Sequence, residues 1–341
     1  MTRFRLSSTL LSALVGILII AVAPCFITVS LLNALTFIAI YTVLVVGLNL
    51  LMGYAGQVSL GHAAFFGIGA YSSAILTLQY HWSPWLAMLA GMVLAAAVAL
   101  LVGIPCLRLH GHYLAMATLG FGWIVFIVMR EWTEVTQGPS GIEAIPKLAL
   151  GSFVFDTDVR RFYLTWAFAI LTLVLSANIV NSRVGRALRA IHGSEAAAAT
   201  LGVNIASYKI QVFMLSAIYA ALAGSLYAHV MNFISPATFG FIQSVGFVVM
   251  VVIGGMASIW GALFGAGTIV MLGEGLQDLG RRFPAFAEFD IIAHGAILIL
   301  VMIFMPSGIV CSVRDAVVRW LRMRTTALQP TPARVEEVAT K

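Results

Sequence analysis

Apolar residues fill most of the chain in long runs, which short polar or glycine-rich segments separate. A helix needs about 20 apolar residues to cross a bilayer. The runs therefore predict about ten membrane-spanning helices, at residues 9–32, 35–53, 63–80, 85–106, 113–131, 163–181, 208–232, 243–259, 262–280 and 290–311. Only an uncharged glycine-rich turn separates the eighth helix from the ninth. Because lipid leaves backbone groups without hydrogen-bond partners, the expected fold is an all-α polytopic membrane protein.

The N-terminal run imitates a signal peptide, because two arginines precede an apolar stretch that ends in Ala21-Val22-Ala23. Pro24 directly after this motif would hinder cleavage, and it also stands where a lipoprotein signal before Cys25 would have a small residue. The apolar run continues to Leu32. We therefore expect residues 9–32 to remain as the first membrane-spanning helix.

Composition supports a membrane protein and argues against an enzyme. Hydrophobic residues make up 61% and charged residues 9% of the chain, whereas a soluble domain has about 25% charged residues. Cys25, Cys106 and Cys311 are isolated among apolar residues, so we expect them to be packing residues. The chain lacks phosphate-loop, zinc-protease, serine-hydrolase and CxxC motifs. We expect no catalytic residues, no metal and no cofactor in this chain.

Basic residues are distributed unevenly among the segments that connect the predicted helices. If the N-terminus lies in the cytoplasm, the cytoplasmic segments hold most of the 19 lysines and arginines, as the positive-inside rule requires. Both termini then face the cytoplasm. Residues 132–162 form a periplasmic loop with turns at its Gly and Pro residues, and residues 182–207 form a helix-prone cytoplasmic loop. The net charge of +6 therefore reflects the orientation of the chain in the membrane, and we expect no nucleic-acid partner.

The segment from Gly47 to Tyr71 is apolar enough for a bilayer, yet it is rich in glycine and uncharged polar residues. Dense glycine lets helices break and lets backbones approach each other closely. We therefore expect helix breaks at Gly53, Gly56 and Gly61.

Three polar residues in this segment stand where an ordinary membrane helix would have leucine or valine: Gln57, Ser59 and His62. Their side chains need partners inside the protein, because lipid offers none. A broken polar segment at membrane depth is typical of a transport pathway. His62 is either a proton relay or, alternatively, a neutral histidine that pairs with a backbone carbonyl.

A second glycine-rich segment repeats part of this pattern. Gly56–Ser59 is followed by Phe-Gly-Ile-Gly, and Gly255–Ser258 is followed by Phe-Gly-Ala-Gly, so both read GxxS…FGxG. Paired glycine-interrupted segments in two halves of a chain indicate a transport pathway, although chance agreement is the alternative. A repeat would make Ser258 a further lining residue and Gly254 and Gly255 further helix breaks. With both turns on the inner side the repeat is parallel; an inverted repeat needs one crossing more or fewer.

The GALFG sequence at residues 261–265 has glycines four residues apart, a pattern that lets helices pack closely. It serves either packing within this chain or, alternatively, an interface between subunits.

The cytoplasmic loop is expected to contain two short helices. Ser182 caps the first, on which Arg186 and Arg189 share one face. Ser194 and Glu195 start the second, and Gly202 ends it. By composition alone, this loop either docks on a partner or lies on anionic lipid.

Several stretches together resemble the permease subunits of ATP-binding-cassette importers for branched-chain amino acids, specifically the second, M-type subunit. They are GLNLLMGYAGQVSLGHAAFFGIGAY, GHYLAMATLGFG, TQGPSGIEAIP, GRALRAIHGSEAAAATLGVN, VVIGGMASIWGALFGA and HGAILILVMIFMPSGIV, which cover residues 47 to about 310. With the predicted helices, the resemblance implies a permease domain at residues 1–320. The polar stretch from about Leu321, with Pro330 and Pro332, predicts a flexible cytoplasmic tail at 321–341. The resemblance also implies that the loop with Arg186, Arg189, Glu195 and Gly202 docks into an ATPase. The stretch His192-Gly193-Ser194 is less charged than in many family members.

The resemblance implies a multi-pass protein of the bacterial inner membrane with several partners. These are a homologous second permease, two cytoplasmic ATPases that bind ATP, and a periplasmic solute-binding protein. Branched-chain amino acids are the expected solute, with urea, short amides and aromatic acids as alternatives within the family. From the residues alone, a stand-alone secondary carrier or channel and a membrane scaffold also stay open.

Overall fold

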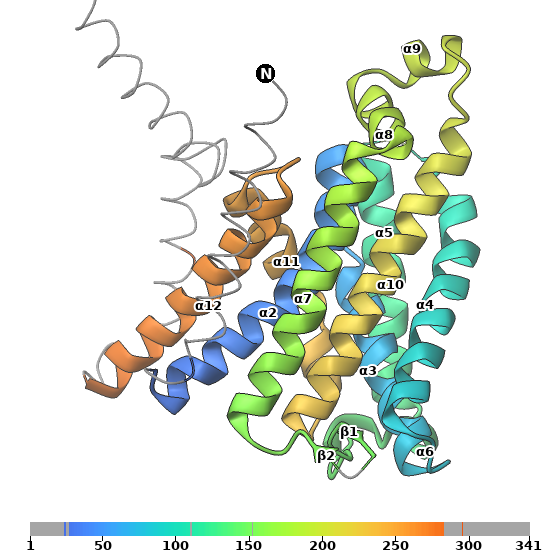
Figure 1. The fold of residues 1–341 in the computed structure, drawn as a ribbon. Helices are drawn as coiled ribbons and strands as arrows, with labels where there is room; N and C mark the ends of the chain where they lie inside the picture. Colours follow the sequence, from blue (N-terminus) through green and yellow to red (C-terminus); the bar gives the residue numbers. More distant parts are fainter. Residues whose placement is uncertain (1–23, 25–26, 110, 152, 283–294, 296–341) are drawn as a thin grey trace, which may run out of the picture.

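The computed structural model describes residues 24, 27–109, 111–151, 153–282 and 295. The predicted last helix at 290–311, the predicted tail at 321–341, Cys25, Cys311 and most of the predicted first helix lie outside the described residues. Within the described part, the chain forms a bundle of long helices with one small hairpin (Figure 1).

The helices follow in the order α2 (Val29–Asn49), α3 (His62–Leu78), α4 (Pro84–Cys106), α5 (His112–Glu131), α6 (Thr133–Thr136), α7 (Asp158–Asn181), α8 (Arg183–Gly193), α9 (Glu195–Thr200), α10 (Ile205–Met231), α11 (Phe241–Gly254) and α12 (Ile259–Arg282). A π-helical turn, η2 (Leu50–Tyr54), extends α2, and two 3₁₀ turns are η3 (Gly138–Ser140) and η4 (Pro236–Phe239). Strands β1 (Ala149–Leu150) and β2 (Phe153–Val154) pair antiparallel, with Ala149 opposite Val154 and Leu150 opposite Phe153.

Six helices among the described residues are long and apolar enough to cross a membrane: α2 with η2, α4, α5, α7, α10 and α12. Helices α3 and α11 are also apolar but have only 17 and 14 residues. The chain is therefore an all-α polytopic membrane protein. The number of about ten crossings and their sidedness stay predictions.

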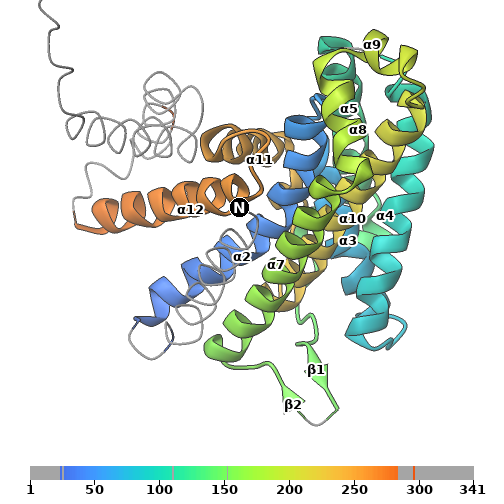
Figure 2. The same cartoon turned by 45° about the horizontal axis from the view of Figure 1, so that its top comes forward.

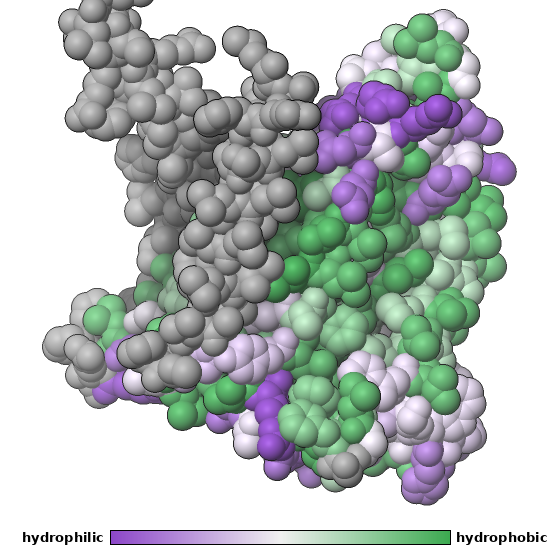
Figure 3. All heavy atoms as spheres, in the orientation of Figure 1, coloured by the Kyte–Doolittle hydropathy of each residue, from purple (hydrophilic) through white to green (hydrophobic). Residues whose placement is uncertain are grey.

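The two ends of the bundle differ in what they carry. Helices α8 and α9 cap one end, which we call the α8–α9 end, and the β1–β2 hairpin projects from the other, which we call the hairpin end (Figures 1 and 2). Figure 3 shows apolar residues across the middle of one face and polar residues near both ends. Exposed apolar side chains such as Val93 and Leu101 on α4 contribute to this surface. The pattern is that of a protein whose middle contacts lipid.

The centre of the bundle is the contact of α10 with α2, α3 and α4. Small residues let these backbones approach: an added Cβ at Gly69 would overlap the Ala221 backbone, and one at Gly224 would overlap the Phe66 carbonyl. The Ser225 hydroxyl also donates to the Gly69 carbonyl at 2.9 Å. Close packing of small residues stabilises helix pairs in lipid, where burial of apolar surface between helices contributes little.

Several predicted helix boundaries were wrong. Helix α2 begins at Val29, so the predicted first helix cannot extend to residue 32. Within this helix the Thr36 hydroxyl donates to the Leu32 carbonyl at 2.9 Å. Helix α7 begins at Asp158 rather than at 163, because Thr157 caps a polar first turn in which Arg161 pairs with Asp158. Helix α11 ends at Gly254 rather than at 259.

The loop between α5 and α7 is ordered, and the turns predicted in it are confirmed. Gly138, Gly141 and Gly151 all adopt a positive φ. The loop is fixed to the end of α10, where His229 Nδ1 lies 2.6 Å from the Pro146 carbonyl and the Asn232 amide donates to the Ile145 carbonyl at 2.7 Å. These bonds hold the loop against the end of α10.

Candidate transport pathway and docking element

The first glycine-rich segment forms a turn at the α8–α9 end. The chain leaves α2 through η2, turns over residues 55–61, and enters α3 at His62. Gly56 adopts φ +69° within the turn, and Gly61 directly precedes α3. Gly53 lies inside η2 and not in the turn. It permits close packing, because an added Cβ would overlap the Ala257 backbone nitrogen and the Asn49 side chain.

The second glycine-rich segment forms a tighter turn between α11 and α12. Gly254 is the last residue of α11, and Gly255 adopts φ +104°. An added Cβ at Gly254 would overlap the Gly261 carbonyl, and one at Gly265 would overlap the Met250 carbonyl. The GALFG glycines therefore pack α12 against α11 within this chain.

The second turn packs against η2, which leads into the first turn, and Asn49 near the end of α2 binds it. Its side-chain amide donates to the Ser258 carbonyl at 2.6 Å, and its side-chain oxygen accepts from the Ala257 backbone N–H at 3.0 Å. Asn49 is 2% exposed. Asn49 was not among the residues predicted from the sequence, although an asparagine in an apolar helix is itself a signal, because its amide needs partners.

His62 lies in a closed cluster of polar side chains near the first turn. Its Nδ1 is 3.0 Å from the Ser59 hydroxyl, and its Nε2 is 2.6 Å from the Ser216 hydroxyl of α10. The ring is 1% exposed and meets Phe65 and Phe213 edge-on. Its partners are thus two serine hydroxyls, not the backbone carbonyl that the simpler interpretation expected.

The other predicted lining residues also have partners within the protein. Gln57 is buried and donates to the Ala55 carbonyl at 3.1 Å. The Ser258 hydroxyl accepts from the Gly261 backbone N–H at 3.2 Å, at the start of α12. The structure brings Ser59 and His62 together, whereas Ser258 lies with Asn49 in the second turn.

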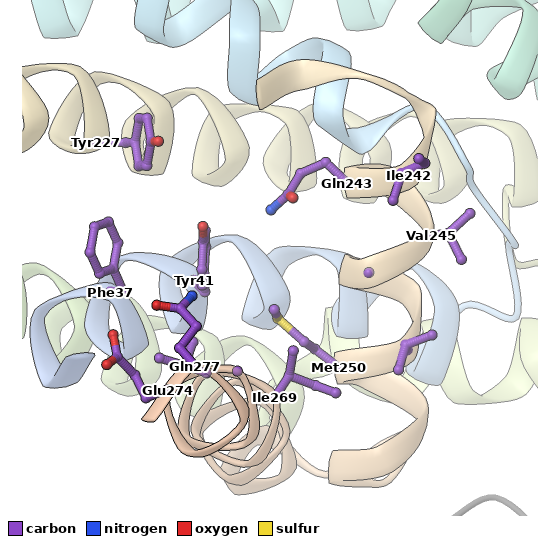
Figure 4. A pocket seen from close by; sticks show the side chains of 14 residues that line it. Phe37, Tyr41, Tyr227, Ile242, Gln243, Val245, Met250, Ile269, Glu274 and Gln277 are labelled. Carbon is purple, nitrogen blue, oxygen red and sulfur yellow. The ribbon is translucent and has the colours of Figure 1, made fainter. Parts of the chain in front are cut away.

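A cavity of about 530 Å³ lies apart from this cluster, between α2, α10, α11 and α12 (Figure 4). Its lining residues are Phe37, Tyr41, Tyr227, Ile242, Gln243, Val245, Gly246, Val249, Met250, Ile269, Val270, Gly273, Glu274 and Gln277. Figures 1 and 2 show why there is space: α12 and the first half of α2 lean away from the rest of the bundle. The volume lies in the range in which proteins bind small molecules.

The cavity combines apolar walls with a few polar groups. Figure 4 shows Tyr41 on α2, Gln243 on α11 and Gln277 on α12 with polar ends inside it. Glu274 contributes a carboxylate from α12, and among the described residues no ion pair or hydrogen bond to it is found. Within the described residues, no cluster of His, Cys, Asp or Glu could hold a metal ion.

The loop after α7 has the two short helices that its sequence predicted. The Ser182 hydroxyl accepts from the Val184 N–H at 3.1 Å, and the Ser194 hydroxyl accepts from the Ala197 N–H at 3.3 Å. Gly202 ends α9 with φ +78°. On α8, Leu188 is buried and the arginines at 183, 186 and 189 are exposed, so one face packs on the protein and the other is free for a partner.

Glu195 differs from the exposed arginines, because it pairs within the chain. Its carboxylate lies 2.6 Å from the Lys209 ammonium on α10, and the Lys209 side chain is 3% exposed. A buried ion pair is costly to break from one side. It holds α9 against the start of α10 and so fixes how the α8–α9 unit is presented.

Helix α8 rests directly on the first glycine-rich turn. An added Cβ at Gly56 would lie 3.1 Å from His192 Nδ1. One turn earlier on α8, Arg189 lies close to Tyr54 of η2, whose hydroxyl lies beside the Ile259 backbone at the start of α12. A displacement of α8 would therefore reach both turns.

Comparison with known proteins identifies the family of this chain. The family described as "Branched-chain amino acid transport system / permease component" matches residues 30–305. The permease protein LivM of Escherichia coli is 34% identical over 87% of this chain and 74% of its own length. LivH of E. coli and BraD of Pseudomonas aeruginosa, also branched-chain amino acid permeases, are each 28% identical. The LivH match covers 81% of this chain and 93% of LivH, and the BraD match covers 82% and 94%. The chain therefore belongs to the family of permease components of branched-chain amino acid transport systems.

Proposed function

We propose that this chain is the M-type permease subunit of an ATP-driven importer that carries branched-chain amino acids across the bacterial inner membrane. Family membership over residues 30–305 and the similarity to LivM support the solute class. The single observation that carries the ATP-driven mechanism is the α8–α9 unit, because its exposed arginines face outward while its buried face rests on the first turn.

The proposed complex contains four kinds of subunit. A second permease pairs with this chain, which is similar to both LivM and LivH of one organism. Two ATPases supply the energy, since the sequence of this chain has no nucleotide-binding motif. A periplasmic binding protein delivers the solute, and it sets most of the selectivity.

We place the α8–α9 end in the cytoplasm and the hairpin end in the periplasm. The excess of lysine and arginine in the segments assigned to the cytoplasm favours this orientation. About ten crossings then put both termini in the cytoplasm. A reporter fused after the last residue is expected to be active on the cytoplasmic side only.

The proposed mechanism is alternating access. Closure of the ATPases moves α8, and the contact of His192 with Gly56 passes the motion to the first turn. Asn49 passes it to the second turn. When the two turns separate, Gln57, Ser59, His62 and Ser258 become candidates for the cytoplasmic part of the pathway. Their neutral side chains would let a solute pass without tight binding.

Purification of the tagged chain from its host in mild detergent tests the proposal. A second permease and two ATPases are expected to co-purify, and the complex in liposomes is expected to take up leucine with ATP and loaded binding protein. A chain that purifies alone and transports leucine on a proton or sodium gradient would establish the secondary-carrier alternative instead.

A further inference from the structure

The cavity between α2, α10, α11 and α12 is closed toward the α8–α9 end. Met250, a buried residue, lines the cavity at this end. Beyond it the glycines of α11 and α12 are in backbone contact. The Asn49 bridge lies at the same end. The remaining lining comes from positions nearer the hairpin end, such as Tyr227 close to the end of α10 and Glu274 in the second half of α12.

The lining has the chemistry that a small zwitterion with an aliphatic side chain requires. A carboxylate attracts an ammonium group, and amide and hydroxyl donors bind a carboxylate. In the cavity, Glu274 offers the carboxylate on one wall, and Gln243 and Tyr41 offer the amide and hydroxyl donors on the opposite wall. Val249, Met250 and Ile269 form apolar surface beside these groups.

We propose that this cavity is a transit site for the amino acid, in which Glu274 binds the α-ammonium group while Gln243 and Tyr41 bind the α-carboxylate. The inference rests on the proposed function and adds the site and the groups that recognise the solute. It differs from the pathway expected from the sequence, because none of Gln57, Ser59, His62 or Ser258 lines the cavity.

The arrangement suits passage rather than storage. Among the described lining residues Glu274 is the one charged group, and the two carboxylate partners are neutral, so binding is weak enough for release. The Gln243 side chain lies beside the Tyr41 hydroxyl, and this places two donors close together on the wall opposite α12. A solute that lacks the ammonium group loses its single charged partner.

Uptake of leucine by the reconstituted complex tests the assignment. Glu274→Gln is expected to lower the uptake rate about tenfold, the change that follows from loss of one charge-assisted hydrogen bond, and Glu274→Asp is expected to retain most of the rate. The matched control is Asp278→Asn on the same helix, because Asp278 is exposed, pairs with Arg281 at 3.2 Å and lies outside the cavity. This control is expected to transport like the unmodified complex.

Saturation-transfer NMR with leucine adds a readout that does not depend on transport. The purified complex without binding protein is expected to give a leucine signal, which Glu274→Gln abolishes and Asp278→Asn preserves. The solute 4-methylpentanoate, which lacks the ammonium group, is expected to give none. Equal signals from leucine and 4-methylpentanoate, or normal uptake by Glu274→Gln, would overturn the inference while leaving the proposed function intact. Absence of leucine uptake by the unmodified complex would contradict the proposed function itself.

Discussion

Two of the polar regions inside the described bundle differ in how their polar groups are satisfied. In the cluster of Ser59, His62 and Ser216, both ring nitrogens of the histidine have hydroxyl partners and the ring is sealed by phenylalanines. In the cavity lined by Gln243 and Glu274, polar groups face open space. The comparison shows that a polar residue in a membrane helix belongs here either to a closed hydrogen-bonded cluster or to the wall of a cavity, and that its surroundings distinguish the two.

The same contrast separates the two halves of the bundle. Toward the α8–α9 end, glycines let backbones touch and Asn49 joins the two turns. Toward the hairpin end, α12 and the first half of α2 lean away and leave the cavity. Added volume should therefore affect folding in the first half and transport alone in the second.

The largest effect is expected from Gly53→Val. The new side chain would overlap the Ala257 backbone and the Asn49 amide, so the two turns cannot stay together. We expect a loss of stability of about 3 kcal/mol or more, measured as early thermal unfolding of the purified complex. The control is Gly120→Val on α5, where an added Cβ meets nothing within 4 Å. Equal unfolding temperatures for the two variants would contradict the close contact of the turns.

A smaller loss is expected from His62→Ala. The change leaves the buried hydroxyls of Ser59 and Ser216 without their partner, which costs about 1–3 kcal/mol. His112→Ala is the control, because His112 is exposed and surface changes stay within about 0.5 kcal/mol. If His62→Ala unfolds like the control but abolishes uptake, the histidine has a direct role in transport and the cluster is not merely a joint.

Gly273→Phe is expected to leave the protein folded and to block transport. Gly273 lines the cavity, and an added Cβ there meets nothing within 4 Å, so the phenyl ring occupies the space that the solute needs. Thermal unfolding should change by less than about 1 kcal/mol while leucine uptake is lost. The control Gly275→Phe places the same ring on an exposed position outside the cavity. Uptake by Gly273→Phe at the control rate would move the solute path elsewhere.

Arg189→Glu is expected to have the smallest effect on folding, within about 0.5 kcal/mol, because its side chain is exposed. We expect ATP hydrolysis to continue without uptake, since α8 no longer transmits ATPase motion to the turns. Arg130→Glu is the control, because Arg130 is an exposed arginine at the hairpin end, far from α8, and coupled uptake is expected to continue in it. Coupled uptake in Arg189→Glu would remove Arg189 from the docking contact.

The sequence predicted the helical fold, the two short loop helices and both glycine-rich turns, because these follow from local patterns. Ser182, Ser194 and Gly202 act within a few residues of their positions in the chain. The cavity could not be predicted in this way, since Tyr41, Tyr227, Gln243 and Glu274 come from four helices and meet only when the bundle forms. The partner of Glu195 was missed for the same reason, because Lys209 lies beyond the end of α9 on another helix.

Predicted helix boundaries were wrong where hydropathy alone could not locate the start of a helix. The start of α2 lies inside a largely apolar segment, where Thr28 is the N-cap residue but its side chain makes no capping hydrogen bond. At α7 the opposite holds, because a polar first turn with Asp158 and Arg161 belongs to the helix although it is not apolar.

The central claim is that the cavity, and not the histidine cluster, is open to the periplasm in this conformation. Single cysteines at Gln243 and at Ser216, in a chain whose three native cysteines are replaced, test it in right-side-out membrane vesicles with a membrane-impermeant thiol reagent. We predict that Gln243→Cys is modified and that Ser216→Cys is not. Modification of Ser216→Cys with an unreactive Gln243→Cys would contradict the account and place the periplasmic opening at the His62 cluster.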